Sequence, residues 1–534
     1  MTMNHPMATR PASLHRLLEL RAAEQPDRTF VLHQGRWWTY RELELHARAI
    51  ARELLALGVK PGDHVAVMMP GCEPYLALWF AISKVGAVEV PLNGAYRGEV
   101  LKHVLRTATP RIAFVHGDHR AVFEATCPGI LDVRDVLDPY GDRFAWHPED
   151  ADALAKMGPG LEVDPSAPAS IIFTSGTTGL SKGVVTSQRH QMSFGHFFTE
   201  IVGFTPADTA YNFLPFFHIA AKFETLGAML AGGRMMLTAS FSLSSFWKDV
   251  KESSATLCVA VGGLCHMLNG IAPAADDADN TLRLIYAVPV PWAFKDAFEQ
   301  RFGLQLVEAY GSTESNLVLY TRLGEELPPG TCGRANASFE ITIQNDEGRP
   351  VPPGIAGEIC MRAQHDQTLM SGYLGLPDKT AEAMRGGCFH SGDQGYMDEN
   401  GFVFFLDRSK DAIRRRGENI SSYEVERLLN AHPDVAEVAV VPVKAVVGED
   451  EVKAVIVRRG GSSLEHEALL DFAVATMPYF MVPRYVEFRE QLPRTETMKV
   501  RKVELRNEGI TPETWDCERA GLRVTRRGLE RKAP

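Results

Sequence analysis

The sequence lacks any apolar run long enough to span a bilayer. Its longest apolar stretch, Tyr75–Ile82, ends at Ser83 and Lys84, whereas a transmembrane helix needs about 20 apolar residues. The first residues also lack the uninterrupted apolar core of a secretory signal peptide. We therefore expect no transmembrane segment and a cytoplasmic location.

Paired cysteines and an excess of basic residues are absent as well. The eight cysteines include no C-x-x-C pair, so neither a zinc site nor a disulfide framework is indicated, and a reducing compartment is favoured. The net charge is −11, which argues against a nucleic acid partner. The basic end at 523–532 is expected to be solvated. These absences favour an enzyme that acts on small molecules.

No internal repeat or low-complexity segment is present, but 534 residues exceed what one hydrophobic core usually holds. The first third alternates predicted strands and helices, and the same rhythm returns between 170 and 310. This alternation is typical of βαβ units in a parallel, doubly wound sheet. The predicted helices cover 14–25, 40–59 and 74–88, and the predicted strands cover 30–40 (two strands with a turn at Gln34 and Gly35), 62–70 and 111–117.

The pattern changes after residue 335. Residues 337–363 alternate apolar and polar side chains between Gly and Pro turns, which predicts antiparallel strands. A smaller unit begins near residue 401. Its predicted strands cover 435–443 and 451–459, and its predicted helix covers 466–477. We predict an α/β fold with a large N-terminal domain (1–406) of doubly wound α/β subdomains plus a small β-rich subdomain, and a small C-terminal α+β domain (407–534).

One short stretch carries three glycines, several hydroxyl side chains and a lysine: "FTSGTTGLSKG" at 173–183. It follows the apolar run 169–173, which predicts a short buried strand. Glycines let backbone N–H groups approach phosphates closely, and lysine adds positive charge. The spacing of an ordinary P-loop is not met, because Gly183 follows Lys182. Taken alone, the stretch fits a different phosphate loop and a mobile surface loop equally well.

Four further stretches occur in order along the chain. They are "LPFFHIAA" (214–221), "VEAYGSTES" (307–315), "FHSGDQGYMDENGFVFFLDRSKDAIRRRGENI" (389–420) and "LPRTETMKVRK" (492–502). Together with the glycine-rich loop, this series resembles the adenylate-forming superfamily of acyl-CoA synthetases, luciferases and peptide-synthetase adenylation domains. The resemblance covers most of the chain.

The resemblance implies a two-step ligase reaction that uses ATP, Mg²⁺ and coenzyme A. A carboxylate attacks the α-phosphate of ATP to give an acyl-adenylate and pyrophosphate, and the thiol of coenzyme A then displaces AMP. In this family no side chain acts as a covalent nucleophile, so catalysis comes from positioning and charge stabilisation. The expected partners are a small carboxylic acid, ATP and coenzyme A, and the expected state is a monomer or homodimer.

The resemblance also implies a nucleotide site. Tyr310 stacks on adenine, Glu308 accepts from the adenine amino group, and Thr313 contacts the α-phosphate. Asp393 takes the ribose hydroxyls through its two carboxylate oxygens, with Arg408 in support. The loop that holds the β- and γ-phosphates consists of Thr174, Ser175, Gly176, Thr177, Thr178, Gly179 and Lys182. The motif around Tyr310 adds Ala309, Gly311 and Ser312 to the nucleotide contacts, and Thr177 and Glu314 are the implied Mg²⁺ ligands.

Four residues mark the mobile part of the implied mechanism. Lys499 bridges the incoming carboxylate and the α-phosphate during adenylation, although Met498 stands where the family usually has Gly. Asp407 is the hinge about which the small domain rotates, and Gly417 lines the pantetheine tunnel. The implied catalytic residues are Lys499, Glu314, Thr174 and His218. We interpret His218 as a gate on the acyl pocket rather than an acid or base.

The sequence says less about the acid. The stretch 214–221 has no acidic residue, which disfavours an amino-acid substrate. Val288 and Val290 suggest a pocket of altered shape, and Lys222 either meets a second polar group of the acid or faces solvent. The sequence is most similar to crotonobetaine/carnitine-CoA ligases and to the ligases of diterpenoid or steroid acids, with fatty acids also open. The alternatives are an acyl-AMP ligase that delivers to a carrier protein, and a non-catalytic nucleotide-binding homologue.

Overall fold

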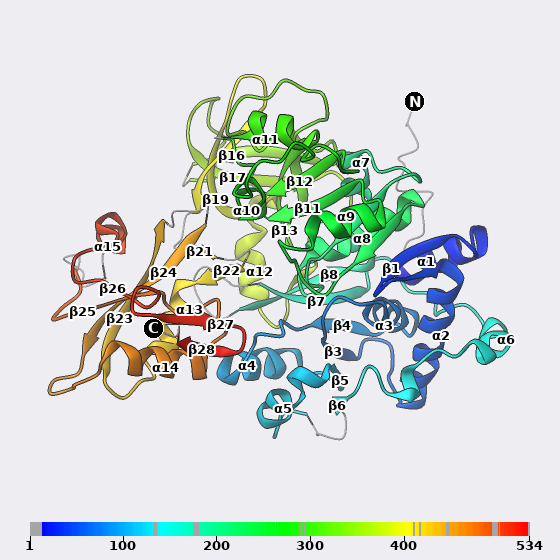
Figure 1. Ribbon diagram of the computed structural model, residues 1–534, viewed down its shortest axis with the longest axis horizontal. Coiled ribbons are helices and arrows are strands. Elements are labelled where there is room, and N and C mark those ends of the chain that lie inside the picture. The colour runs from blue at the N-terminus through cyan, green and yellow to red at the C-terminus, as the bar shows by residue number, and fades with distance from the viewer. Residues whose placement is uncertain are drawn as a thin grey trace.

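The computed structural model forms a larger N-terminal body and a smaller C-terminal one, which lie side by side in Figure 1. Strand β20 (Val403–Arg408) closes the larger body and strand β21 (Ala412–Arg415) opens the smaller one. This confirms the predicted α/β architecture, whereas the boundary between 406 and 407 stays a prediction. The structure describes residues 13–131, 136–174, 181–261, 263–288, 290–292, 294–345, 347–408, 412–415, 418–444, 449–493, 500 and 502–531.

The first sheet of the larger body has the order β18-β8-β7-β4-β3-β5-β6. Its central pairs are parallel, as the alternation predicts, and β8 adds to β7 in the antiparallel direction. The strands are β3 (His64–Met68), β4 (Val88–Pro91), β5 (Ile112–Val115), β6 (Val136–Leu137), β7 (Pro168–Thr174), β8 (Lys182–Ser187) and β18 (Gly372–Tyr373). Helices near it are α4 (Gly98–Ala108), α5 (Gly117–Thr126) and α12 (Pro377–Ala383), whereas α6 (Ala151–Ala155) packs on helix α2 (Tyr40–Ala56).

The second sheet has the order β15-β14-β13-β12-β11-β9-β10-β1-β2 and is parallel from β13 to β1. Its strands are β1 (Thr29–His33), β2 (Arg36–Thr39), β9 (Thr209–Asn212), β10 (Arg234–Leu237), β11 (Leu257–Val261), β12 (Leu284–Val288), β13 (Gln305–Ser312), β14 (Asn316–Tyr320) and β15 (Arg334–Ala335). Helices α9 (Phe246–Ser253), α10 (Gly263–Asn269) and α11 (Lys295–Phe302) accompany it.

Five helices pack their apolar faces against the sheets of the larger body. The main hydrophobic core contains side chains of these helices together with residues of β3 and β5 from one sheet and of β1 and β9–β13 from the other. The helices are α1 (Leu14–Glu24), α2 (Tyr40–Ala56), α3 (Glu73–Lys84), α7 (Gln188–Val202) and α8 (Ile219–Ala231). None of the helices in the described ranges is long and apolar enough to cross a membrane.

The remaining sheets are smaller. An antiparallel sheet with the order β16-β17-β19-β20 completes the larger body, with β16 (Phe339–Gln344), β17 (Gly357–Ala363) and β19 (Phe389–Met397). The smaller body holds the sheet β23-β24-β25-β26 and two hairpins. Its elements are β22 (Glu418–Ser421), α13 (Ser422–Leu429), β23 (Val435–Lys444), β24 (Asp450–Arg458), α14 (His466–Thr476), β25 (Tyr485–Arg489), α15 (Lys502–Glu508), β26 (Trp515–Asp516), β27 (Leu522–Thr525) and β28 (Gly528–Arg531).

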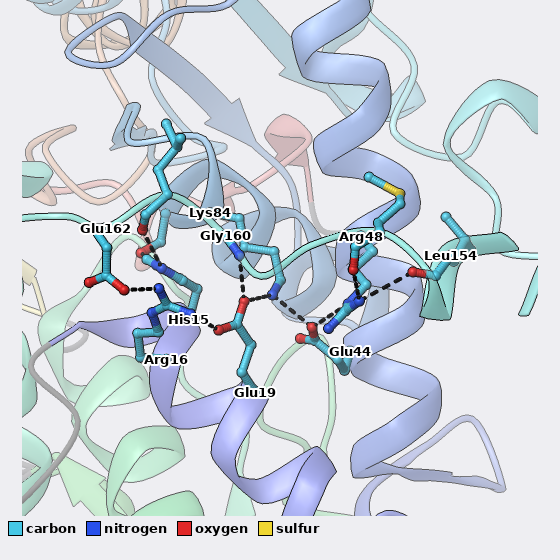
Figure 2. Close-up of polar contacts among 12 residues, drawn as sticks. His15, Arg16, Glu19, Glu44, Arg48, Lys84, Leu154, Gly160 and Glu162 are labelled. Carbon is cyan, nitrogen blue, oxygen red and sulfur yellow. Dashed lines mark hydrogen bonds and ion pairs between the residues drawn. The ribbon is translucent and has the colours of Figure 1, made fainter. Parts of the chain in front are cut away.

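A buried polar network fixes α1 against α2 and α3 (Figure 2). The Lys84 ammonium lies 2.7 Å from a Glu19 oxygen and 2.8 Å from a Glu44 oxygen. Glu19 also accepts from the peptide N–H of Gly160. Nearby, burial and the charge of Lys84 lower the pKa of His15 to about 4, so the ring is neutral at pH 7. Each buried charge here has a partner, as buried charges require.

Helix α1 also holds the far end of α8. The guanidinium of Arg21 donates to the carbonyl oxygens of Met229 and Leu230, at 2.8 and 2.6 Å. These carbonyls belong to the last turn of α8, where few intrahelical donors remain, so a basic side chain stabilises them. Gly232 follows with φ +70° and ends the helix. Helix α8 is therefore anchored at its C-terminal end, and its N-terminal end is free to form a site.

Candidate active site

The glycine-rich stretch leaves the end of strand β7, as the sequence predicts. Thr174 is the last residue of β7 and pairs in register with Lys182, the first residue of β8. Both side chains are therefore held at the base of the connection by the ladder between the two strands. Ser175, Gly176, Thr177, Thr178 and Gly179 lie outside the described residues, so their predicted phosphate contacts stay predictions.

A carboxylate lies beside this base. The hydroxyl of Thr174 donates to a Glu314 oxygen at 3.4 Å, and the hydroxyl of Tyr373 donates to the same oxygen at 3.2 Å. The Lys182 ammonium lies 4.0 Å from the centre of the Tyr373 ring. Three of the predicted site residues, from two distant parts of the chain, are thus brought together around Tyr373. Carboxylate and hydroxyl oxygens are ligands that suit Mg²⁺, so Glu314 and its surroundings fit the predicted metal.

Strand β13 and the turn after it present the motif "EAYGSTE". A Cβ on Gly311 would lie 1.9 Å from the carbonyl oxygen of Asn316, so only glycine fits there. The hydroxyls of Ser312 and Ser315 lie 3.0 Å apart and close the turn. Thr313 is half-buried within it. The turn is therefore rigid, and it holds Thr313 between the predicted adenine and metal positions on either side.

Glu308 lies deeper than the predicted role suggests. Its side chain is buried, and a carboxylate oxygen accepts from the peptide N–H of Val290. Burial raises its pKa to about 8, against the opposing effect of that N–H. The carboxyl group therefore ties β13 to the loop after β12, beside Ala309. Its predicted contact with the adenine amino group stays a prediction.

The predicted adenine and ribose residues touch. The Tyr310 hydroxyl donates to a carboxylate oxygen of Asp393 at 2.7 Å. Asp393 lies in β19 and pairs in register with Arg408 of β20, and its neighbour Gln394 pairs with Asp407. The second sheet and the small antiparallel sheet therefore meet at this bond. The side chains of Asp407 and Arg408 lie outside the described part of the structure, so the hinge and the ribose support stay predictions.

His218 joins the two bodies of the protein. It is the N-cap residue of α8, and its Nε2 lies 3.1 Å from a carboxylate oxygen of Glu418 in β22. Asn93 donates to the other oxygen of Glu418 at 3.4 Å. Burial, Glu418 and Glu424 raise the pKa of Tyr96 well above its ordinary range at the same contact. The hairpin β21–β22 therefore rests on the larger body beside α8. Gly417, in its turn, is outside the described residues.

The described residues on either side of Lys499 belong to the smaller body. Residues 494–499 lie outside the described residues. On either side, Leu492 and Val500 pack in a small apolar cluster with Val441, Val455 and Leu505, all from the smaller body. Helix α15, directly after this stretch, lies at the outer left of Figure 1, away from β13 and α8. In this arrangement the hairpin β21–β22 contacts the site, and helix α15 lies away from it.

Lys222 corrects an expectation. Its side chain neither reaches an acid substrate nor faces solvent, because it is fully buried against Glu89 at 2.7 Å to both carboxylate oxygens. Tyr75 and Ser170 also donate to that carboxylate. Burial lowers the pKa of Lys222, and Glu89 partly offsets this. The pair joins α8 to β4, because an ionised group in the core requires an opposite charge.

Sequence reasoning missed three residues at this site. Tyr373 supports Glu314 and Lys182, and no motif in the sequence marks it. Asn93 and Glu418 make the contact with the smaller body. Glu418 stands next to the predicted Gly417, so it lies within the predicted motif. The motif did not indicate its contact with the larger body. A contact between two domains depends on their arrangement, which a linear pattern does not encode.

Comparison with known proteins identifies the same regions. The model of the family described as "AMP-binding enzyme" matches residues 18–374, and that described as "AMP-binding enzyme C-terminal domain" matches residues 424–499. A crotonobetaine/carnitine–CoA ligase of Salmonella arizonae is 30% identical over 486 residues, covering 88% of this chain and 93% of the relative. A relative of the same name from Escherichia coli is also 30% identical, over 87% of this chain and 92% of its own length.

Solved structures share the fold. An amide bond synthetase from Marinactinospora thermotolerans has a TM-score of 0.81 at 24% identity, covering 93% of this chain and 99% of its own. The o-succinylbenzoate CoA synthetase of Bacillus subtilis has a TM-score of 0.80 at 23% identity, covering 92% and 98%. ATP-bound MatB from Rhodopseudomonas palustris has a TM-score of 0.67 at 26% identity, covering 92% and 98%. The first two support the fold alone.

Proposed function

Since the chain belongs to the family of AMP-binding enzymes and, within it, to the acyl-CoA ligases that use ATP and coenzyme A, we propose how its own residues carry out the reaction. The chain activates a carboxylic acid as an acyl-adenylate with release of pyrophosphate. It then transfers the acyl group to the thiol of coenzyme A, and AMP leaves.

The observation that carries this proposal is the meeting of the nucleotide residues. Tyr310 and Asp393, which the motifs assign to adenine and ribose, are in direct contact. Glu314, in the turn after β13, and Thr174, at the end of β7, are assigned to the metal and the phosphates and are likewise in contact. These pairs come from β13, β19 and the end of β7. A nucleotide laid along them would have its base at Tyr310 and its phosphates at the glycine-rich loop.

The first step requires two anions to approach each other. We assign Glu314 and Thr177 to Mg²⁺, which supplies charge neutralisation at the phosphates when bound. Thr313 and Lys182 orient the phosphates, and Lys499 reaches the carboxylate and the α-phosphate. The proposed contribution of each is positioning and charge stabilisation.

The second step uses the other face of the smaller body. The hairpin β21–β22 lies against Asn93 and His218, and we propose that pantetheine enters beside its turn at Gly417. Rotation about Asp407 would exchange this face for the one that carries Lys499. His218 lies where the acid and the thiol meet, and its contact with Glu418 supports a gating role.

For the acid substrate we propose a class of compounds. The relatives named crotonobetaine/carnitine–CoA ligase favour a carnitine-type acid, with fatty and steroid or terpenoid acids as the other classes. We propose a cytoplasmic enzyme that is a monomer or homodimer.

Pyrophosphate release from ATP with a panel of acids, with and without coenzyme A, tests this function. The panel holds short, medium and long fatty acids, carnitine-type acids, steroid and resin acids, and benzoates. Release that requires an acid and ends in acyl-CoA supports the proposal. Release that ends in bound acyl-adenylate despite coenzyme A would instead indicate delivery to a carrier protein, and no release with any acid would indicate a non-catalytic homologue.

A matched pair of variants controls the assay. Glu314→Gln removes the carboxylate beside Thr174 and should abolish most of the release, whereas Glu399→Gln changes an exposed carboxylate in a turn and should leave it intact. Equal activity in both variants would argue against the assigned metal site.

A further inference from the structure

Helix α8 carries a carboxylate that the proposed mechanism does not use. Glu224 is fully buried, and among the buried carboxylates of the described residues it is the one whose two oxygens both lack a hydrogen-bond partner. The peptide N–H of Val259 lies nearby but outside hydrogen-bonding geometry. Burial raises the pKa of Glu224 well above its ordinary range. Burial therefore favours the neutral form of this carboxyl group.

This isolation contrasts with the surrounding interior. Two residues earlier on α8, Lys222 forms a complete buried pair with Glu89. Glu308, on strand β13, accepts a hydrogen bond from the peptide N–H of Val290. The protein thus satisfies the neighbouring buried carboxylates, as buried polar groups usually are. An exception of this kind at a functional site calls for a ligand as its partner.

Glu224 lies on the helix that leads away from the reacting end of the site. His218 caps the N-terminus of α8, and the helix begins at Ile219. From Ile219 to Glu224 the helix rises by about 8 Å, at about 1.5 Å per residue. An acid whose carboxylate lies beside His218 and whose chain follows α8 therefore ends near Glu224. Unlike the half-buried start of α8, Glu224 is fully buried in the free protein.

Aromatic side chains gather around Phe223, the residue before Glu224 on α8. Phe223, next to Glu224, lies 5.1 Å from Phe198 and 5.9 Å from Tyr286 between ring centres. Phe194 stacks on Phe223 at 6.0 Å. Tyr286 pairs in register with Val259, the residue whose N–H lies near Glu224. Aromatic faces attract cations, and most strongly a weakly hydrated quaternary ammonium.

Resting on the proposed function, we propose that Glu224 is the counter-ion for a cationic group at the far end of the acid substrate. The favoured substrate is a carboxylic acid with a trimethylammonium or ammonium group along or at the end of its chain. When the cation enters, the Glu224 carboxyl gives its proton to solvent and becomes the paired carboxylate. No covalent bond changes at this position.

The position of Glu224 is also compatible with the lack of an acidic residue in the motif at 214–221. The absence of an acidic residue from 214–221 disfavours an amino-acid substrate, whose ammonium lies next to its carboxylate. Glu224 lies three residues beyond that stretch, about 5 Å further along the helix axis. It therefore suits a cation that is remote from the substrate carboxylate. A cationic acid is thus compatible with the argument against an amino-acid substrate.

Matched acids test the proposal. Trimethylammonio-butanoate and trimethylammonio-hexanoate are each compared with the acid in which carbon replaces the quaternary nitrogen, so that shape stays constant and charge changes. Pyrophosphate release is measured for the wild type, for Glu224→Gln, and for Glu252→Gln, which changes an exposed carboxylate on α9. We expect the wild type and Glu252→Gln to prefer one cationic acid over its neutral counterpart by about tenfold or more in kcat/KM.

Glu224→Gln should lose about 100-fold in kcat/KM for the cationic acid while keeping its activity on the neutral one. The same preference in the wild type and in Glu224→Gln, or no preference in the wild type, would overturn the inference. Failure of every acid would instead count against the proposed function. If Glu224→Gln does not fold, the thermal shift of the wild type with ATP and each acid of a pair decides, and equal shifts overturn the proposal.

Discussion

The buried pair of Lys222 and Glu89 allows the sharpest stability prediction. Both side chains are fully buried, and the carboxylate receives Lys222 on both oxygens at 2.7 Å. Lys222→Met keeps the length of the side chain but leaves the carboxylate without its cation. The remaining donors, Tyr75 and Ser170, do not neutralise it. Breaking a buried pair in this way costs about 3–5 kcal/mol.

The double variant isolates the charge. Lys222→Met with Glu89→Gln leaves a neutral amide, so we expect a cost of about 1–2 kcal/mol, well below the sum of the costs of the two single variants. Lys248→Met removes a lysine on α9 that is 72% exposed, 3.6 Å from Glu252, and should cost no more than about 0.5 kcal/mol.

Urea unfolding followed by tryptophan fluorescence measures these differences. The ring of Trp79 lies 4.2 Å from the Lys222 ammonium, so its emission reports on this part of the core. With a slope of about 3 kcal/mol per molar urea, Lys222→Met should lower the midpoint by about 1 M or more. A shift as small as that of Lys248→Met, or single costs that simply add in the double variant, would refute the reasoning.

Further predictions concern the site and the pH response. Tyr310→Phe removes the donor to Asp393 and should raise the KM for ATP by about fivefold to tenfold; an unchanged KM would separate this bond from the nucleotide. Lys499→Ala should stop pyrophosphate release yet leave thioester formation from supplied acyl-AMP largely intact, while Glu418→Gln, which weakens the contact with His218, should slow only the thioester step; equal losses in both half-reactions of either variant would contradict domain rotation. Because burial and Lys84 lower the pKa of His15 to about 4 from 6.5, unfolding takes up a proton between these values, so stability is present above pH 6.5 and is lost as the pH falls toward 4. Thermal melts of His15→Gln should show a shallower loss over this range than the wild type, and parallel melts would contradict the assignment.

Local patterns predicted the fold well because its elements are strongly periodic. The helix predicted over 40–59 is α2, and the strand predicted before the glycine-rich loop is β7. Thr39 and Glu42 form a capping box at the start of α2, a signal that lies within four residues of sequence. The predicted antiparallel strands at 337–363 are β16 and β17. Signals of this kind depend only on neighbours along the chain.

Side-chain roles that depend on distant partners were harder to predict. Lys222 directly follows the motif at 214–221 and was expected to meet the acid or to face solvent. It instead pairs with Glu89, 133 residues away. The sequence likewise gives no sign that Glu224 is isolated, because this depends on the absence of hydrogen-bond donors in the segments packed around it. The predicted contacts of Tyr310 and Asp393 followed from a resemblance, and the structure adds the hydrogen bond between them. The roles of site residues could therefore be predicted where a local motif marks them. They could not be predicted where burial and distant partners determine the role.

The most direct test of the account follows an oxygen isotope. An accepted acid labelled with ¹⁸O in its carboxylate is incubated with MgATP and coenzyme A, and the nucleotide and pyrophosphate are analysed by mass spectrometry. If the carboxylate attacks the α-phosphate and the thiol then attacks the carbonyl carbon, the AMP carries one ¹⁸O and the pyrophosphate carries none. Label in inorganic phosphate with ADP as the product, or unlabelled AMP beside newly formed acyl-CoA, would contradict an acyl-adenylate intermediate.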